Sequence, residues 1–159
     1  MKLFANELKI YSKDFTLSPK QLRTFSTTAK LDWKKVKFTP GNHKSVPVAR
    51  GIYAFVVEHN VSQLPPHGYV MYVGITGDTG KHNLRRRYGN YLRDKIIDKR
   101  AGIHYMLNNW AASIYFHYAV VADKRYRLAT LETNMTDALI PPYNSKDFSA
   151  EVRKAKKAF

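Results

Sequence analysis

Two stretches without lysine or arginine, residues 51–80 and 101–123, constrain the fold of this otherwise basic chain more than any other feature. Within them lie three short runs of β-branched and aromatic residues, at 52–57, 69–73 and 114–121. Such runs are typical of buried β-strands. The pattern therefore predicts three strands.

The first two strands are expected to pair as a hairpin, because they follow one another along the chain. Their connection, residues 58–68, contains Pro65, Pro66 and Gly68, which interrupt regular structure. We therefore expect a loop between them and not a tight turn.

Helices are predicted around these strands. Asn83 is a suitable N-cap for a helix from Leu84 to about Arg100, in which apolar residues recur every four positions. Three further helices are expected at 19–29, 104–110 and 124–139. The expected fold class is α+β, with a small three-stranded antiparallel sheet flanked by helices and preceded by an N-terminal extension.

The charge is distributed in blocks, and its distribution predicts the organisation of the chain. Residues 1–50 carry eleven basic and three acidic side chains, and residues 81–100 carry eight and two. A length of 159 residues favours one domain with decorations. We expect a basic N-terminal extension at 1–50, a folded domain at 51–147 and a basic C-terminal tail at 148–159.

The net charge points to a polyanionic partner. Lysine and arginine outnumber aspartate and glutamate by 27 to 12, a formal surplus of +15. Such a surplus attracts nucleic acid, although a solubility surplus or a basic membrane-surface protein would have the same composition. The distribution of charge is what favours nucleic acid.

Several classes of protein are excluded by composition and motif. The chain has no cysteine, which excludes disulfides, thiolate zinc sites and cysteine nucleophiles. It has no phosphate-binding P-loop and no glycine-rich dinucleotide signature, so no nucleotide cofactor is expected. It also lacks a long apolar run and a secretory signal, which predicts a cytoplasmic protein without membrane attachment.

Two tripeptides and one helix hold candidate chemical groups. Gly51-Ile52-Tyr53 and Tyr72-Val73-Gly74 lie on the paired strands, where alternation allows the Tyr53 and Tyr72 hydroxyls to meet over one face. Arg87 and Tyr91 share one face of the following helix at the edge of the core. Strand tyrosines alone are typical of core packing, whereas a guanidinium at that position needs an anion such as phosphate.

These residues, together with Asn83-Leu84, Glu132 and an asparagine twelve residues beyond it at position 144, resemble the GIY-YIG nuclease superfamily. The resemblance covers residues 51 to about 147 and depends on five elements in the same order. The chain has Val73 where the second tripeptide of the family has isoleucine, and Tyr91 where many members have histidine.

The resemblance implies a metal-dependent endonuclease that hydrolyses DNA phosphodiester bonds. It implies that Glu132 anchors one divalent ion, Mg²⁺ or Mn²⁺, because a single carboxylate suits these ions better than zinc. The candidate catalytic residues are Tyr53, Tyr72, Arg87, Tyr91, Glu132 and Asn144.

The roles within this group follow from what phosphodiester hydrolysis requires. We hypothesise that Tyr53 is the general base and that Arg87 compensates charge on the phosphate. Tyr72 and Tyr91 are expected to orient water or phosphate. Asn144 is expected to brace the loop or the glutamate.

Other arginines are expected to contact the DNA backbone without sequence preference. These are Arg85, Arg86 and Arg93, for which a solvated basic face is the alternative. Asp78, in the loop after the second strand, either contacts the substrate or fills space. A single active site cuts one strand at a time, so cleavage of both strands would imply a homodimer or sequential nicking.

The biological role stays open among restriction or defence, DNA repair and mobile-element nucleases. The alternative outside enzymes is a basic nucleic-acid-binding protein without catalysis, for which charge and aromatic residues suffice.

Overall fold

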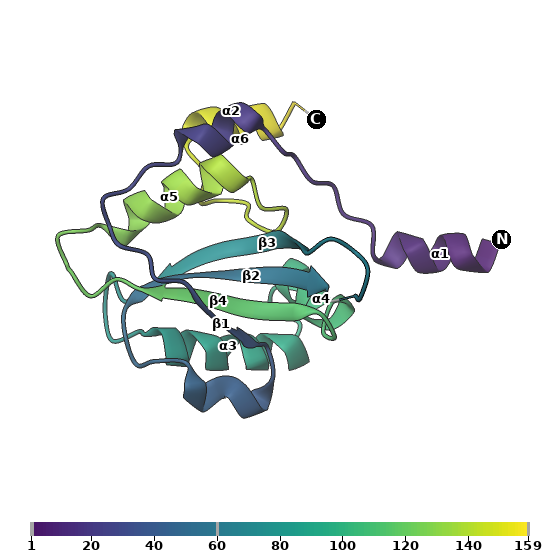
Figure 1. Ribbon diagram of the computed structural model, residues 1–159, viewed down its shortest axis with the longest axis horizontal. Helices are drawn as coiled ribbons and strands as arrows, with labels where there is room; N and C mark the ends of the chain where they lie inside the picture. The colour runs from purple at the N-terminus through teal and green to yellow at the C-terminus, as the bar shows by residue number, and fades with distance from the viewer. Residues whose placement is uncertain (1, 60, 159) are drawn as a thin grey trace.

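The computed structural model describes residues 2–59 and 61–158 and shows an α+β fold. A four-stranded antiparallel sheet forms the middle layer, with helices on both faces (Figure 1). The strand order is β1-β4-β2-β3. The strands are β1 (Lys34–Lys37), β2 (Gly51–His59), β3 (His67–Thr76) and β4 (Ile114–Val120).

The helices divide between the two faces of the sheet. Helices α3 (Leu84–Ile96) and α4 (Ala101–Asn109), with the 3₁₀ helix η1 (Pro40–Ser45), cover one face, and α2 (Pro19–Thr24) and α5 (Leu128–Leu139) cover the other (Figure 1). Helix α6 (Ala150–Lys156) lies over α5, whereas α1 (Lys2–Ile10) projects from the body (Figure 1). No helix in the described part of the chain could span a membrane.

The α+β class and the antiparallel sheet flanked by helices are confirmed, but the predicted number of strands is wrong. The fourth strand, β1, pairs antiparallel with β4, with Val36 opposite Phe116. Its sequence is Lys-Lys-Val-Lys. Val36 is partly buried, and the three lysines are exposed. Lysines on an edge strand oppose its pairing with the strands of other chains. Because β1 contains no apolar run, the sequence pattern did not predict it.

Several predicted boundaries also differ. Helix α3 ends at Ile96 and not near Arg100, where a new turn leads into α4. Ile96, the last residue of the predicted apolar repeat, is 81% exposed, and Tyr91 is buried instead. Both hairpin strands extend beyond their predicted ends, which shortens the connecting loop. Helices α1 and α6 were not predicted.

Strand β2 separates two cores, because successive side chains point to opposite faces. Tyr53 and Phe55 enter an aromatic core beneath α3, where the Tyr53 ring stacks 5.2 Å from Phe116 between centroids. Ile52 and Ala54 enter an aliphatic core beneath α5. The chemical groups of Tyr53 therefore belong to the α3 face of the sheet.

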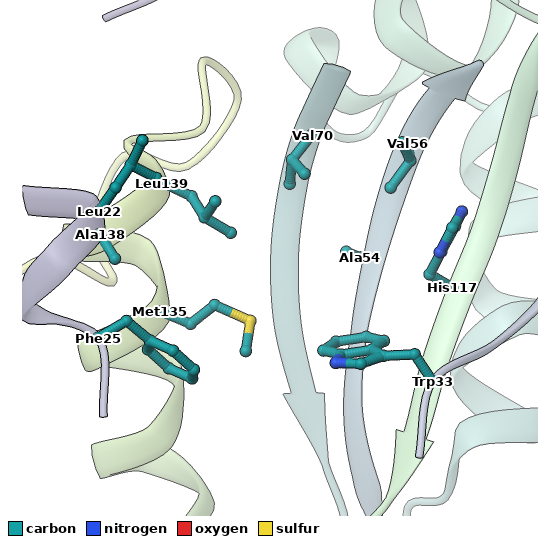
Figure 2. Close-up of a pocket in the computed structure, with 10 residues that line it drawn as sticks. All are labelled: Leu22, Phe25, Trp33, Ala54, Val56, Val70, His117, Met135, Ala138 and Leu139. Carbon is teal, nitrogen blue, oxygen red and sulfur yellow. The ribbon is translucent and has the colours of Figure 1, made fainter. Parts of the chain in front are cut away.

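The α5 face also contains an open apolar cavity of about 420 Å³ (Figure 2). Strand residues and Trp33, directly before β1, line one side, and residues of α2 and α5, with Phe25, line the other. Its lining is Leu22, Phe25, Trp33, Ala54, Val56, Val70, His117, Met135, Ala138 and Leu139. The cavity lies on the opposite face of the sheet from Tyr53.

Arg50, directly before β2, ties the sheet to the start of α5. Its side chain is only 11% exposed and donates to the carbonyl oxygens of Val121, Asp123 and Tyr126 at 2.8 to 2.9 Å. It also donates to the Asp78 carboxylate at 2.9 Å. One guanidinium thus fixes three chain segments.

Asp78 completes this junction. Its carboxylate accepts from the backbone N–H groups of Leu128 and Ala129, in the first turn of α5. A negative charge at a helix N-terminus is stabilising. Asp78 therefore positions α5 within the protein, which is a structural use of a residue considered above for substrate contact.

Replacing Arg50 with alanine is expected to destabilise the protein by about 3 to 5 kcal/mol, because Asp78 and three carbonyl groups would lose a largely buried partner. Urea unfolding measures the change. Arg86→Ala, at an exposed position, is the control and should shift stability by less than about 0.5 kcal/mol. Equal effects of the two substitutions would contradict this role of Arg50.

Candidate active site

The candidate site lies at the open edge of β3, the strand at one end of the sheet. Met71, Val73 and Ile75 alternate along β3, so their backbone groups point to the same edge. The chain after α5 partners this edge, beginning with the Tyr143 N–H, which donates to the Met71 carbonyl at 3.0 Å. Residues from the two faces of the sheet can meet only at such an edge.

Asn144 forms the closest link at this edge. Its Oδ1 accepts from the Val73 N–H at 2.8 Å, and its Nδ2 donates to the Val73 carbonyl at 2.8 Å. Nδ2 also donates to Asp147 Oδ2 at 3.0 Å. Asn144 is 2% exposed, so its amide groups are directed at protein partners.

Tyr53, Arg87 and Tyr91 form one hydrogen-bonded cluster on the α3 face. Arg87 Nε donates to Tyr53 Oη at 2.9 Å, and Tyr91 Oη lies 2.9 Å from the same oxygen. Tyr53 and Tyr91 are fully buried. The half-buried Tyr72 ring lies beside them, with its centroid 6.4 Å from that of Tyr53 and 6.2 Å from that of Tyr91.

The glycines of the two tripeptides make room for this packing. A Cβ on Gly74 would lie 2.4 Å from the Tyr53 hydroxyl oxygen, and one on Gly51 would lie 2.2 Å from the Ala119 carbonyl oxygen. Both distances are far below van der Waals contact. Gly74 therefore permits the Tyr53 side chain to lie across β3.

Arg87 is a half-buried cation without an acidic partner: no carboxylate of the described residues is within ion-pair distance of it. Burial lowers its pKa, but the neighbouring phenols of Tyr53 and Tyr91 raise that pKa above its ordinary value. Arg87 therefore stays charged. A desolvated guanidinium favours binding an anion that can accept from several of its N–H groups.

Arg100 is a second cation at the site. Its guanidinium carbon lies 4.9 Å from the centre of the Tyr91 ring, and that of Arg87 lies 5.6 Å from it. Both arginines line a pocket of about 460 Å³ that also contains Arg93 and Lys99. The same pocket contains the Asp94 carboxylate, which pairs with Arg100, so its positive charges are only partly balanced.

Glu132 reaches the site from α5 and has an unusual acidity. Burial and the nearby charge of Asp147 raise the pKa of Glu132 to about 7, whereas Arg87 and a hydrogen bond from the Ile75 backbone lower it. Glu132 is half-buried on α5, and the charges of Arg87 and Asp147 influence its acidity. Its carboxyl group is therefore costly to ionise without a cation.

Tyr53 is more weakly acidic than an ordinary tyrosine. Burial raises its pKa well above the usual value, the neighbouring Tyr91 and Tyr72 raise it further, and Arg87 lowers it. The Tyr53 hydroxyl is therefore protonated at neutral pH. Ionising it would require positive charge in addition to that of Arg87.

The acidic side chains near the site are candidates for binding a hard cation. The described residues contain no group of three or more histidine, cysteine, aspartate or glutamate side chains able to hold a metal. Glu132 and Asp147 offer carboxylate oxygens only, a set that fits Mg²⁺ or Mn²⁺, which retain waters, better than zinc.

The structure thus brings together Tyr53, Tyr72, Arg87 and Tyr91, with Glu132 and Asn144 at the adjoining edge of β3. Asp147 and Arg100 were missed as site residues. Arg100 was expected only as the approximate end of one continuous helix beginning at Leu84, and no site role was given to it. Asp147 belongs to no periodic sequence pattern. Its position three residues after Asn144 was the one signal that could have suggested it.

The three arginines expected to contact DNA differ in their surroundings. Arg85 donates to the carbonyl oxygens of Val46 and Lys44, at 2.7 and 3.0 Å, and so holds the chain after η1. Arg86 is exposed, and the exposed Arg93 lines the pocket next to Arg87. Arg86 and Arg93 are therefore the freer of the three to contact a ligand.

Comparison of the chain with protein-family models, curated proteins and solved structures finds no match in any of the three. The resemblance to GIY-YIG nucleases therefore depends on the residues of this chain and their spacing.

Glu132→Gln is expected to stabilise the protein at pH 8 by about 1 to 2 kcal/mol, a figure reduced because solvent reaches the carboxylate. A raised pKa means that the native state binds the Glu132 proton more tightly than the unfolded state. Stability is therefore lost as pH rises from about 4.5 to about 7.

Urea unfolding of the wild type and Glu132→Gln at pH 8 and pH 4.5 tests this expectation. The difference between the two proteins should be present at pH 8 and largely absent at pH 4.5, where the carboxyl group is mostly protonated. The same difference at both pH values would contradict the raised pKa of Glu132.

Proposed function

We propose that the protein is a metal-dependent endonuclease of the GIY-YIG type that hydrolyses DNA phosphodiester bonds. The observation that carries the proposal is Arg87, a half-buried guanidinium with a phenol on its Nε and no carboxylate partner in residues 2–59 and 61–158. A phosphate group would supply the missing negative charge.

Charge compensation at the phosphate is the proposed role of Arg87. Its Nε is bound to Tyr53, which fixes the plane of the guanidinium and leaves its terminal nitrogens for a phosphate oxygen. Arg93 and Lys99 in the adjoining pocket add positive charge for neighbouring phosphates, whereas Arg100 there is paired with Asp94. Donors held in place before the reaction stabilise the charge that develops in the transition state.

Deprotonation of the attacking water is the proposed role of Tyr53. Burial raises the pKa of Tyr53, so its hydroxyl is expected to carry its proton at neutral pH in the absence of a cation. A divalent cation at Glu132 would supply the further positive charge that favours the phenolate. Tyr91 Oη, 2.9 Å from Tyr53 Oη, can donate to the phenolate once it forms.

DNA is the proposed substrate because the chain carries a net charge of +15 and basic side chains surround the site. One site cuts one strand at a time, so double-strand cleavage would require two protomers or two successive cuts. Restriction or defence, repair and mobile-element roles all fit this chemistry.

Supercoiled plasmid with Mg²⁺ or Mn²⁺ tests the activity. The wild type is expected to nick the plasmid, and Glu132→Ala to be silent. Arg87→Ala should lower the rate roughly 10²- to 10³-fold through loss of a transition-state donor. Arg23→Ala, at an exposed position of α2 on the opposite face of the sheet, is the control and should retain cutting within a few-fold. Plasmid binding without cutting in either metal would instead identify a non-catalytic nucleic-acid-binding protein.

Tyr53→Phe tests the general base separately. It is expected to lower nicking roughly 10²- to 10⁴-fold at neutral pH, because the proton acceptor is lost while the ring still fills the core. Tyr118→Phe removes a hydroxyl from another buried tyrosine of the same core and should leave nicking unchanged. Full cleavage by Tyr53→Phe would eliminate Tyr53 as the base.

A further inference from the structure

Asp147 is fixed in position by both its side chain and its backbone. Its Oδ2 accepts from Asn144 Nδ2 at 3.0 Å, and Asn144 is itself bound to both backbone groups of Val73 on β3. The buried Thr136 hydroxyl lies 2.6 Å from the Asp147 carbonyl oxygen and 2.9 Å from that of Glu132. The turn that carries Asp147 is therefore tied to the turn of α5 that carries Glu132.

Asp147 lies beside Tyr72 at the border of the candidate site. Asp147 and Tyr72 line one pocket of about 400 Å³, together with Arg100 and Lys146. The negative charge of Asp147 raises the pKa of Glu132, second only to burial, and also contributes to the raised pKa of Tyr72. Asp147 thus lies close to a second carboxyl group and to a candidate catalytic phenol.

Neither acidic residue has a basic partner within the described ranges. Glu132 and Asp147 are absent from the ion pairs found there, although the chain contains 27 lysines and arginines. Two neighbouring carboxylates without a cation repel one another. Magnesium and manganese sites commonly use one or two carboxylates together with water.

We propose that Asp147 acts with Glu132 in holding the divalent cation, so that the site has two acidic residues and not one. This inference rests on the proposed function. Asn144 is then a positioning residue, since its amide orients the Asp147 carboxylate toward the site. The binding energy of the cation offsets the repulsion between the two carboxylates.

Mn²⁺ binding to the full chain tests this inference without measuring cleavage. Calorimetry at pH 8, above the pKa of about 7 of Glu132, would compare the wild type with Asp147→Asn, with and without a short DNA duplex. Asp147→Asn is expected to weaken Mn²⁺ binding roughly 10- to 100-fold. The new side chain retains an oxygen that can accept from Asn144, and thermal unfolding verifies that the variant is folded.

Asp14→Asn, at an exposed position in the N-terminal segment, is the matched charge control and should bind Mn²⁺ as the wild type does. Mn²⁺ binding by Asp147→Asn equal to that of the wild type, with binding lost in Glu132→Gln, would overturn the role of Asp147 and leave the proposed nuclease intact. No Mn²⁺ binding by the wild type with or without duplex would overturn both.

Discussion

The bridge from Asn144 to Val73 is the interaction on which the candidate site most depends. Tyr53, Arg87 and Tyr91 belong to the α3 face of the sheet, whereas Glu132 comes from α5 on the opposite face. The two groups can meet only around the edge strand β3. Asn144 holds the chain after α5 against that edge by satisfying both backbone groups of Val73.

The groups at this edge are arranged at a cost to stability. Glu132 is held near Asp147, Arg87 lacks a carboxylate partner in the part of the chain described, and Tyr53 is buried where its ionised form is disfavoured. Each arrangement would be relieved by a bound cation or phosphate. Strained electrostatics of this kind are typical of functional sites and uncommon in groups that serve packing alone.

At the Arg50 junction, by contrast, the charged groups are satisfied by the protein. Arg50 binds Asp78 and three carbonyl oxygens, and Asp78 in turn caps α5. This junction sets the position of α5, and therefore of Glu132, relative to the sheet. The contrast between the fully partnered Arg50 and the incompletely partnered Arg87 separates a structural arginine from a candidate ligand-binding one.

The parts of the fold that were predictable from sequence are those encoded locally. Apolar runs identified β2, β3 and β4, and Asn83 was correctly predicted to cap α3, where its Oδ1 accepts from the Arg86 N–H at 2.9 Å. Strand β1 was missed because its lysines conceal the alternation.

The residues of the candidate site were harder to predict from sequence than the fold was. Four-residue spacing placed Arg87 and Tyr91 on one face of a helix, and the family resemblance supplied Glu132 and Asn144. Arg100 lies at the site because the helix ends at Ile96, and Asp147 is held there by tertiary hydrogen bonds. Neither feature produces a local sequence pattern.

The most direct test of the account follows the Arg87 side chain itself by nuclear magnetic resonance. A short DNA duplex would be titrated into the cleavage-deficient Glu132→Gln variant while the Nε–H resonances of the arginines are recorded. The Arg87 resonance should shift in proportion to duplex bound and saturate with it, because a phosphate becomes the acceptor of its guanidinium. Saturating duplex binding that shifts other arginines and leaves Arg87 unchanged would contradict a phosphate site at Tyr53 and Arg87.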